Sequence, residues 1–202
     1  MKDKEEAAEF TRRVDAEKAS IDQNDADAQF YLGICYAEGR DVPKDEVEAV
    51  KWYRKAAEQN HAIAQNNLGA CYANGEGVEK DEAEAVKWYR KAAEQNFAGA
   101  QSNLGFCYSK GQGVVLDYAE AAKWYHKAAE QNYAGAQHNL GCCYVNGEGV
   151  VPDYAEAYKW VNLAAAQGDE NAKKLRDDLE KVMTPERIAE GQRLAREFKP
   201  KQ

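Results

Sequence analysis

The side chains that could carry nucleophilic or metal chemistry in this sequence are five cysteines and three histidines. Four of the cysteines recur at a constant step of 36 residues: Cys35, Cys71, Cys107 and Cys143. A thiolate can attack a substrate or bind a metal, but a disulfide or a metal site needs several such groups close together. One cysteine per repeat places equivalent thiols about one repeat apart. We therefore expect these four to be small buried hydrophobic residues, while Cys142 points elsewhere.

The histidines, His61, His126 and His138, share no repeat position. None lies at a recognisable triad spacing from a serine, cysteine or aspartate, and the chain has no C-x-x-C pair. The repeated G-x-G precedes an acidic helix start at Glu79 and Asp81, which would repel a phosphate. We therefore expect no catalytic residues, no metal and no cofactor. An enzyme that uses groove residues is the least supported alternative.

The charge and hydropathy of the chain exclude further classes. The net charge of −8 makes nucleic acid an unfavourable partner, because an acidic surface repels phosphates. The acidity belongs to residues 1–168, and the segment 169–202 is near neutral. No stretch approaches the roughly 18–20 apolar residues that a membrane span needs. We expect neither nucleic-acid binding nor a membrane span.

The cellular compartment is predicted from the thiols and the first residues. The start of the sequence, MKDKEEAAEF, is charged throughout and lacks the apolar core of a signal peptide. Unpaired thiols are typical of a reducing compartment. We expect a cytoplasmic protein, and a signal peptide removed before residue 1 stays an open alternative.

A period of 36 residues runs through the chain. It is carried by Trp52, Trp88, Trp124 and Trp160, by Leu32, Leu68, Leu104 and Leu140, and by Gly33, Gly69, Gly105 and Gly141. One unit, read from Ala64, begins with the helix-forming segment AQNNLGACYANG, which Gly75 and Gly77 end. Asp81 and Glu84 then form a predicted capping box, in which the aspartate accepts from a free N–H and the glutamate reaches back. A second helix follows through DEAEAVKWYRKAAEQN.

A single helix pair of this kind buries too little apolar surface to be stable, so neighbouring pairs must stack. The period predicts an all-α solenoid of stacked antiparallel helix pairs, with about eleven helices. We expect one domain over 1–202: an N-terminal capping helix in 1–25, four repeats in 26–168, and a degenerate half-repeat with a capping helix in 169–202. The last helix should begin at Thr184-Pro185 and end near Phe198.

The motifs A-x-x-x-L-G-x-x-Y, G-x-G-V, D-x-x-E-A and W-Y-x-K-A-A, over about residues 26–182, resemble the Sel-1-like repeat of the tetratricopeptide-repeat-like superfamily. This resemblance implies a right-handed superhelix whose first helices line a concave face, and an adaptor role that is common in bacteria. It also implies a departure. Cysteine-rich secreted relatives carry two linked cysteines per repeat, where this chain has Ala57 and Gln65, Ala93 and Gln101, and Ala129 and Gln137.

Positions that vary between otherwise similar repeats are free to bind a partner. On the first helix of each pair, variable positions at spacings of three and four share one face. They are Phe30, Tyr31, Ile34, Asn66, Asn67, Ala70, Asn74, Ser102, Asn103, Phe106, Lys110, His138, Asn139, Cys142 and Asn146. By analogy with tetratricopeptide grooves this is the concave face. Its asparagines can donate to and accept from a peptide backbone, and Phe30 and Phe106 add apolar contacts.

Two alternatives stay open for these residues. In the first, these residues vary only because they face solvent. In the second, Asn67, Asn103 and Asn139 bond to neighbouring helices. The Trp-Tyr pairs should pack between successive second helices, with an exposed ladder on the convex face as the other reading. We expect a monomeric scaffold that binds another protein or an extended peptide on the concave face. A designed or purely structural consensus array without a ligand is the alternative.

Overall fold

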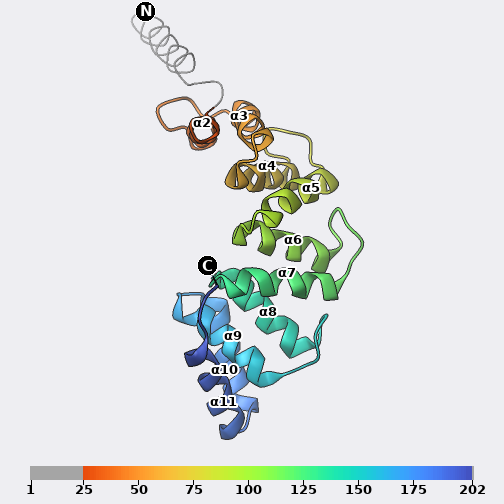
Figure 1. The fold of residues 1–202 in the computed structure, drawn as a ribbon, viewed down its shortest axis with the longest axis vertical. Helices are drawn as coiled ribbons and strands as arrows, with labels where there is room; N and C mark the ends of the chain where they lie inside the picture. Colours follow the sequence, from red (N-terminus) through yellow and green to blue (C-terminus); the bar gives the residue numbers. More distant parts are fainter. Residues whose placement is uncertain (1–24, 202) are drawn as a thin grey trace, which may run out of the picture. The chain divides into compact units, whose positions relative to one another are not determined.

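The computed structural model describes residues 25–201, and this part of the chain contains ten helices and no strand (Figure 1). The helices are α2 (Ala26–Glu38), α3 (Glu46–Glu58), α4 (Ala62–Asn74), α5 (Glu82–Glu94), α6 (Ala98–Lys110), α7 (Tyr118–Glu130), α8 (Ala134–Asn146), α9 (Tyr154–Ala166), α10 (Glu170–Val182) and α11 (Pro185–Glu197). The all-α class is confirmed. The capping helix that was predicted within residues 1–25 lies outside the described residues.

The second helix of each pair begins at an aspartate, as predicted. Asp45 Oδ1 accepts from the backbone N–H groups of Val47 and Glu48, at 3.0 Å each. The other half of the predicted capping box is wrong, because the Asp45 N–H already donates to the carbonyl of Tyr36 at 2.9 Å. With no donor left to meet, the Glu48 carboxylate instead pairs with the Lys51 ammonium. The same arrangement recurs at Asp81, Asp117 and Asp153.

The first helix of each pair ends at a glycine in the left-handed region, with φ between 67° and 76° at Gly39, Gly75, Gly111 and Gly147. This is the predicted role of Gly75. The second glycine of the loop has a different role: a Cβ on Gly77 would lie 2.1 Å from the Glu46 carbonyl oxygen. The loop therefore passes directly over the backbone of α3, and only glycine fits there.

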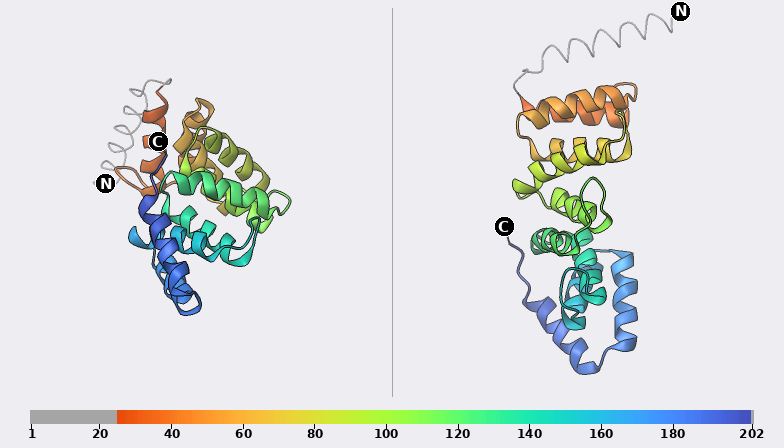
Figure 2. Two further views of the ribbon diagram at one scale, coloured as in Figure 1. Left: turned by 60° about the horizontal axis from the view of Figure 1, so that its bottom comes forward. Right: turned by 90° about the vertical axis from the view of Figure 1, so that its right-hand side faces the viewer.

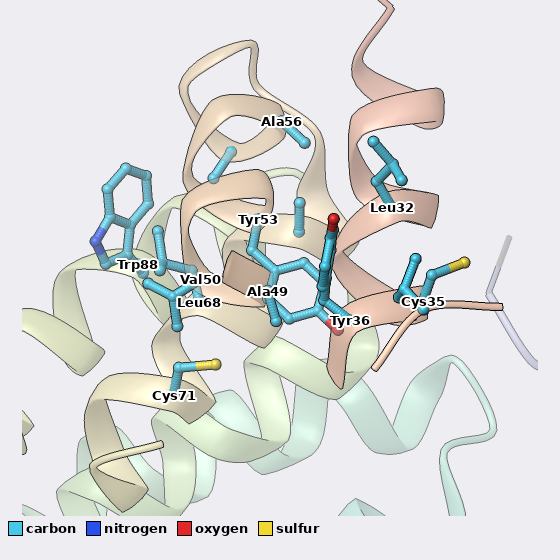
Figure 3. Packing of buried hydrophobic residues seen from close by; sticks show 13 residues of the cluster. Leu32, Cys35, Tyr36, Ala49, Val50, Tyr53, Ala56, Leu68, Cys71 and Trp88 are labelled. Atoms are coloured by element: carbon cyan, nitrogen blue, oxygen red, sulfur yellow. The ribbon is translucent and has the colours of Figure 1, made fainter. Parts of the chain in front are cut away.

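The chain divides into two compact units, one ending at Trp88 and the other beginning at Tyr89. In the first unit α3 packs against both α2 and α4. Figure 3 shows Tyr53 at the centre of this core, between the side chains of α2 and those of Leu68 and Cys71 on α4. Trp88 is also buried in this cluster, at 6% exposure. The first-unit core therefore depends on residues from both helices of the next pair.

In the second unit, consecutive helices from α6 to α10 pack in the same pairwise manner. The order departs from the repeat at the end, where α11 packs against α9 (Figures 1 and 2). Gly191 permits this approach, because a Cβ there would lie 2.9 Å from the Tyr158 side chain. Trp124 and Trp160 are buried, so the predicted packing of the tryptophans is confirmed and the exposed ladder is wrong for them.

Buried glutamines tie three consecutive helices together. The Nε2 atoms of Gln65, Gln101 and Gln137 donate to the carbonyls of Ala57, Ala93 and Ala129, at 3.0 to 3.2 Å. Gln137 Oε1 in turn accepts from Gln167 of the following second helix, at 2.8 Å. These are the positions at which the resemblance places linked cysteines in other proteins. Here hydrogen bonds between buried amides connect the same positions.

Candidate functional site

Five of the residues predicted to line a groove meet around one hollow in the second unit. The hollow has a volume of about 360 Å³ and lies between α6, α7 and α8. The five predicted residues are Phe106, Lys110, Asn139, Cys142 and Asn146. The lining is completed by Ser109, Tyr118, Tyr125, Cys143 and Glu148. Aromatic, amide, thiol and charged groups thus converge on a concave surface, as they do in small-ligand and side-chain pockets.

Tyr125 is a buried member of this lining, with 3% of its surface exposed. Its hydroxyl lies 3.3 Å from Ser109 Oγ, and Ser109 also donates to the Phe106 carbonyl at 2.9 Å. Burial raises the pKa of Tyr125 to about 12, although the hydrogen bond to Ser109 acts in the opposite direction. Near neutral pH this phenol is therefore an uncharged hydrogen-bonding group.

The mouth of the hollow is aromatic. Phe106 is 45% exposed and Tyr118 is 38% exposed, although large apolar side chains are usually covered. Lys110 and Glu148 place one charge of each sign beside them. The hollow therefore offers apolar contact area with little net charge, which suits a side chain of a partner better than a small anion.

The thiols of the hollow are not activated for nucleophilic attack. Cys142 Sγ lies 3.6 Å from His138 Nε2, a contact that resembles a nucleophile–base pair. Burial, followed by the carboxylates of Glu148 and Asp169, raises the pKa of Cys142. Burial also raises the pKa of Cys143 to about 12. A catalytic cysteine needs a lowered pKa, so this pair does not have the electrostatics of a nucleophile.

The first unit contains an equivalent but smaller hollow of about 250 Å³. Its lining includes Tyr53, Asn67, Ala70 and Cys71, of which Asn67 and Ala70 were predicted groove residues. The Asn67 side chain is hydrogen-bonded to the Tyr53 hydroxyl of the neighbouring helix. This contact agrees with the alternative that Asn67 bonds to a neighbouring helix. Burial raises the pKa of Tyr53 to about 12, as at Tyr125.

The remaining predicted residues do not line either hollow. Phe30 stacks on His61, with ring centroids 4.7 Å apart, and Ser102 is only 8% exposed. Tyr31 is 57% exposed on α2, and Asn74 donates to Glu76 at 3.1 Å. Ile34 packs partly buried on the first-unit core, Asn66 and Asn103 are partly buried, and His138 contacts Cys142.

Sequence reasoning missed several lining residues because it compared only some positions of the first helices and none of the loops or second-helix starts. Tyr118 starts a second helix and stands where the other repeats have Glu46, Glu82 and Tyr154. Ser109 replaces Ala37 of the first repeat. The same rule of variable positions, applied to every position of the repeat, would have identified both. Tyr125 gives no such signal, because a tyrosine recurs at that position in the first three repeats.

Within residues 25–201, no group of three or more histidine, cysteine, aspartate or glutamate side chains is placed to hold a metal ion. Over the same residues, no helix combines the length and apolar character that crossing a bilayer requires.

Comparison with solved structures identifies similar chains. A protective antigen of uropathogenic Escherichia coli, described as having an SLR fold, is 38% identical over 90% of this chain, with a TM-score of 0.85. A Sel1 repeat protein from Oxalobacter formigenes is 37% identical, with a TM-score of 0.74, and the match covers 89% of this chain and 74% of that one. The chain spans 39% of the length of the E. coli antigen.

Helicobacter pylori cysteine rich protein B is 30% identical, with a TM-score of 0.52, over 65% of this chain and 95% of that protein. A search of curated protein sequences found no match. The family model of the Sel1 repeat matches four consecutive segments, at residues 26–61, 62–97, 98–133 and 134–169. These segments cover most of the chain and contain every helix from α2 to α9. The chain therefore belongs to the Sel1 repeat family, whose all-helical repeats are protein-interaction scaffolds.

Proposed function

We propose that this chain is a scaffold that binds a protein or peptide, and that its binding site is the hollow between α6, α7 and α8. The observation that carries the proposal is Phe106, which is 45% exposed at the mouth of a hollow of about 360 Å³. Exposed aromatic residues beside a pocket are the usual energetic centres of protein interfaces. The family role as an interaction scaffold supports the same reading.

The chemistry of the lining defines the partner. Phe106 and Tyr118 offer apolar area, and Asn139 and Asn146 offer amide groups that can pair with a peptide backbone. The single lysine, Lys110, is offset by Glu148, so neither a strongly acidic nor a strongly basic segment is favoured. The proposed partner is an extended segment that inserts one apolar side chain into the hollow.

A peptide-display selection on the purified protein tests this proposal. Selected peptides should bind the wild-type chain and lose at least tenfold in affinity for Phe106→Ala, because truncation of an interface aromatic typically costs more than about 1.4 kcal/mol. Tyr31→Ala is the matched control, since it removes an aromatic residue that is 57% exposed away from the hollow.

Two results would count against the proposed site. Peptides that bind Phe106→Ala as tightly as wild type would place binding elsewhere on the chain. A selection that enriches no peptide would instead favour a purely structural repeat array. The first comparison requires that Phe106→Ala melts within a few degrees of wild type.

A further inference from the structure

The end of the chain lies against the repeats themselves. Beyond α11, residues 198–201 run in extended form back toward the end of α7 (Figures 1 and 2). The Lys201 N–H donates to the Glu130 carbonyl at 2.8 Å, and the Lys201 ammonium lies 2.5 Å from the Glu130 carboxylate. Phe198 meets Trp160 of α9 edge-on, with ring centroids 5.4 Å apart. This short segment thus has one apolar, one charged and one backbone contact.

The carbonyl that the segment engages is one that a helix leaves open. Glu130 is the last residue of α7, so its carbonyl has no partner within the helix. The Lys201 N–H satisfies that carbonyl, and its ammonium is a cation at the negative end of the helix dipole. Pro200 has a restricted φ, so the segment loses less conformational freedom when it docks. The contact therefore has the features of peptide recognition.

The receiving surface differs from its equivalents in the earlier repeats. At the position of His126, the first two repeats carry Arg54 and Arg90, which donate to Tyr72 and Tyr108 of the next first helix. His126 is shorter, and it lies 5.8 Å from the Trp160 ring and 3.6 Å from the Glu130 carboxylate. Within the described residues, the ion-pair partners of Glu130 are His126 and Lys201 and not an arginine, so its carboxylate can bind a lysine from another segment.

Space also remains beside this surface. A hollow of about 390 Å³ borders His126 and is lined by Lys123, Lys127, Leu140 and Val150 among others. None of the residues 198–201 is part of its lining. A longer partner segment could therefore extend past the contacts that the chain's own end makes.

We propose that the surface formed by His126, Glu130 and Trp160 is a second binding site, for an extended segment with an aromatic residue three positions before a lysine. The chain's own residues 198–201 occupy it as an intramolecular competitor. A partner peptide of the same chemistry must displace them. This site is separate from the Phe106 hollow and does not depend on it.

A labelled peptide tests the competition directly. Fluorescence anisotropy would measure the binding of LAREFKPKQ, the sequence of residues 194–202, to the full-length wild type and to the full-length double variant Phe198→Ala/Lys201→Ala. A tethered segment acts at an effective concentration of about 1 mM, so a peptide with a dissociation constant near 0.1 mM should bind the variant roughly tenfold more tightly. A peptide with alanine at the aromatic and at the final lysine is the matched control and should not bind.

A charge exchange identifies the receiving carboxylate. Glu130→Lys, added to the double variant, should abolish binding of LAREFKPKQ, and LAREFKPEQ should bind this triple variant again. Phe106→Ala should change neither result, which separates this site from the one proposed above. Lys201→Ala alone, with a side chain that is 70% exposed, cannot disturb folding and should strengthen peptide binding about threefold.

Three outcomes would overturn the inference. The peptide could bind the wild type and the double variant equally, or fail to bind the variant at all. The wild type could also form a concentration-dependent dimer that Lys201→Glu dissolves, which would mean that the segment docks on a second copy.

Discussion

The two units contain hollows at equivalent positions, 72 residues apart. The hollows share a frame, by which we mean the residues that recur from repeat to repeat, and they differ in the exposed residues at the mouth. Tyr53, Asn67, Cys71 and Glu76 of the first correspond to Tyr125, Asn139, Cys143 and Glu148 of the second. At the mouth, the first unit has the ion pair of Lys44 and Glu46, with 2.9 Å between Nζ and Oε1. The equivalent positions of the second unit are Leu116 and Tyr118, which are 49% and 38% exposed, and of these Tyr118 lines the hollow.

The difference distinguishes the positions that packing fixes in every repeat from the exposed positions that can vary. Tyr53 and Tyr125 are equally buried because each packs under a first-helix glycine, Gly33 and Gly105. The mouth residues differ between the units while this tyrosine–glycine packing is the same, so the chemistry of the mouth can change without loss of that packing. Where the first unit has the Lys44–Glu46 ion pair, the second has apolar side chains, and its hollow is larger. The repeat supplies a hollow in each unit, and the lining of the second includes the exposed aromatic residues Phe106 and Tyr118.

The largest effect is expected from the buried glutamines, which belong to the common frame. Gln65→Leu and Gln137→Leu should each destabilise the chain by about 2–3 kcal/mol, because carbonyls and amides of neighbouring helices lose their buried partners. The Gln137 side chain, for example, is hydrogen-bonded to Ala129, Asn132 and Gln167. Denaturant unfolding followed by circular dichroism would measure both.

The two glutamine variants should lose similar amounts of stability if the frame is common to both units. A loss confined to one would show that the frames differ. Lys174→Leu is a suitable control, because Lys174 is exposed on α10 and should change stability by less than about 0.5 kcal/mol.

A slightly smaller effect is expected where the glycine and tyrosine of each hollow touch. A Cβ on Gly105 would lie 2.8 Å from Tyr125 Cδ1, and one on Gly33 would lie 2.4 Å from Tyr53 Cδ1. Overpacking of this kind typically costs about 1–3 kcal/mol, which outweighs the gain of roughly 1 kcal/mol from replacing a helical glycine. Thermal melts should show both losses.

Peptide binding then separates the two glycine variants. Gly105→Ala should also weaken binding of the selected peptides, because it displaces the buried tyrosine of the second hollow. Gly33→Ala should leave that affinity unchanged. Equal weakening by both would mean that the site is not confined to the second unit.

The extent to which the sequence predicted this molecule follows from the same distinction. The helices, the terminal glycines and the buried cysteines follow from the 36-residue period, because every repeat must satisfy the same packing. The capping glutamates were misread, since sequence does not reveal that the Tyr36 carbonyl already meets the Asp45 N–H. The hollow was half predicted: Phe106 and Asn139 were found, while Tyr118 and Ser109, on a second helix and at the end of a first, were not. The contact between Lys201 and Glu130 joins residues outside the period, and no repeat pattern predicts it.

A direct test of the mouth exchanges its two versions. Leu116→Lys/Tyr118→Glu gives the second unit the ion pair of the first, and it should lower affinity for the selected peptides about fivefold, or roughly 1 kcal/mol. Stability should change by less than about 0.5 kcal/mol, since exposed ion pairs contribute little. The reverse exchange, Lys44→Leu/Glu46→Tyr, should add a weak second site that isothermal titration calorimetry would detect. Unchanged affinity in the first variant would remove the mouth from the proposed site.

The smallest effect concerns the two buried tyrosines and depends on pH. Burial raises the pKa of both Tyr53 and Tyr125 from 10.0 to about 12, so the folded state favours the neutral phenol. The stability from this preference is fully present below about pH 10 and is lost as the pH rises from 10 through 12. Tyr53→Phe and Tyr125→Phe should each cost about 1 kcal/mol at pH 8, through the lost hydrogen bonds to Asn67 and Ser109.

Between pH 10 and pH 11.5 each phenylalanine variant should lose less stability than the wild type, because one ionisable group has been removed. Denaturant midpoints across this range would measure the difference. The two variants should reduce the alkaline loss by similar amounts, since the tyrosines share their burial and one hydrogen bond each. A reduction in only one variant would show that the two buried tyrosines differ in environment. The hollows would then differ in their frames as well as at their mouths.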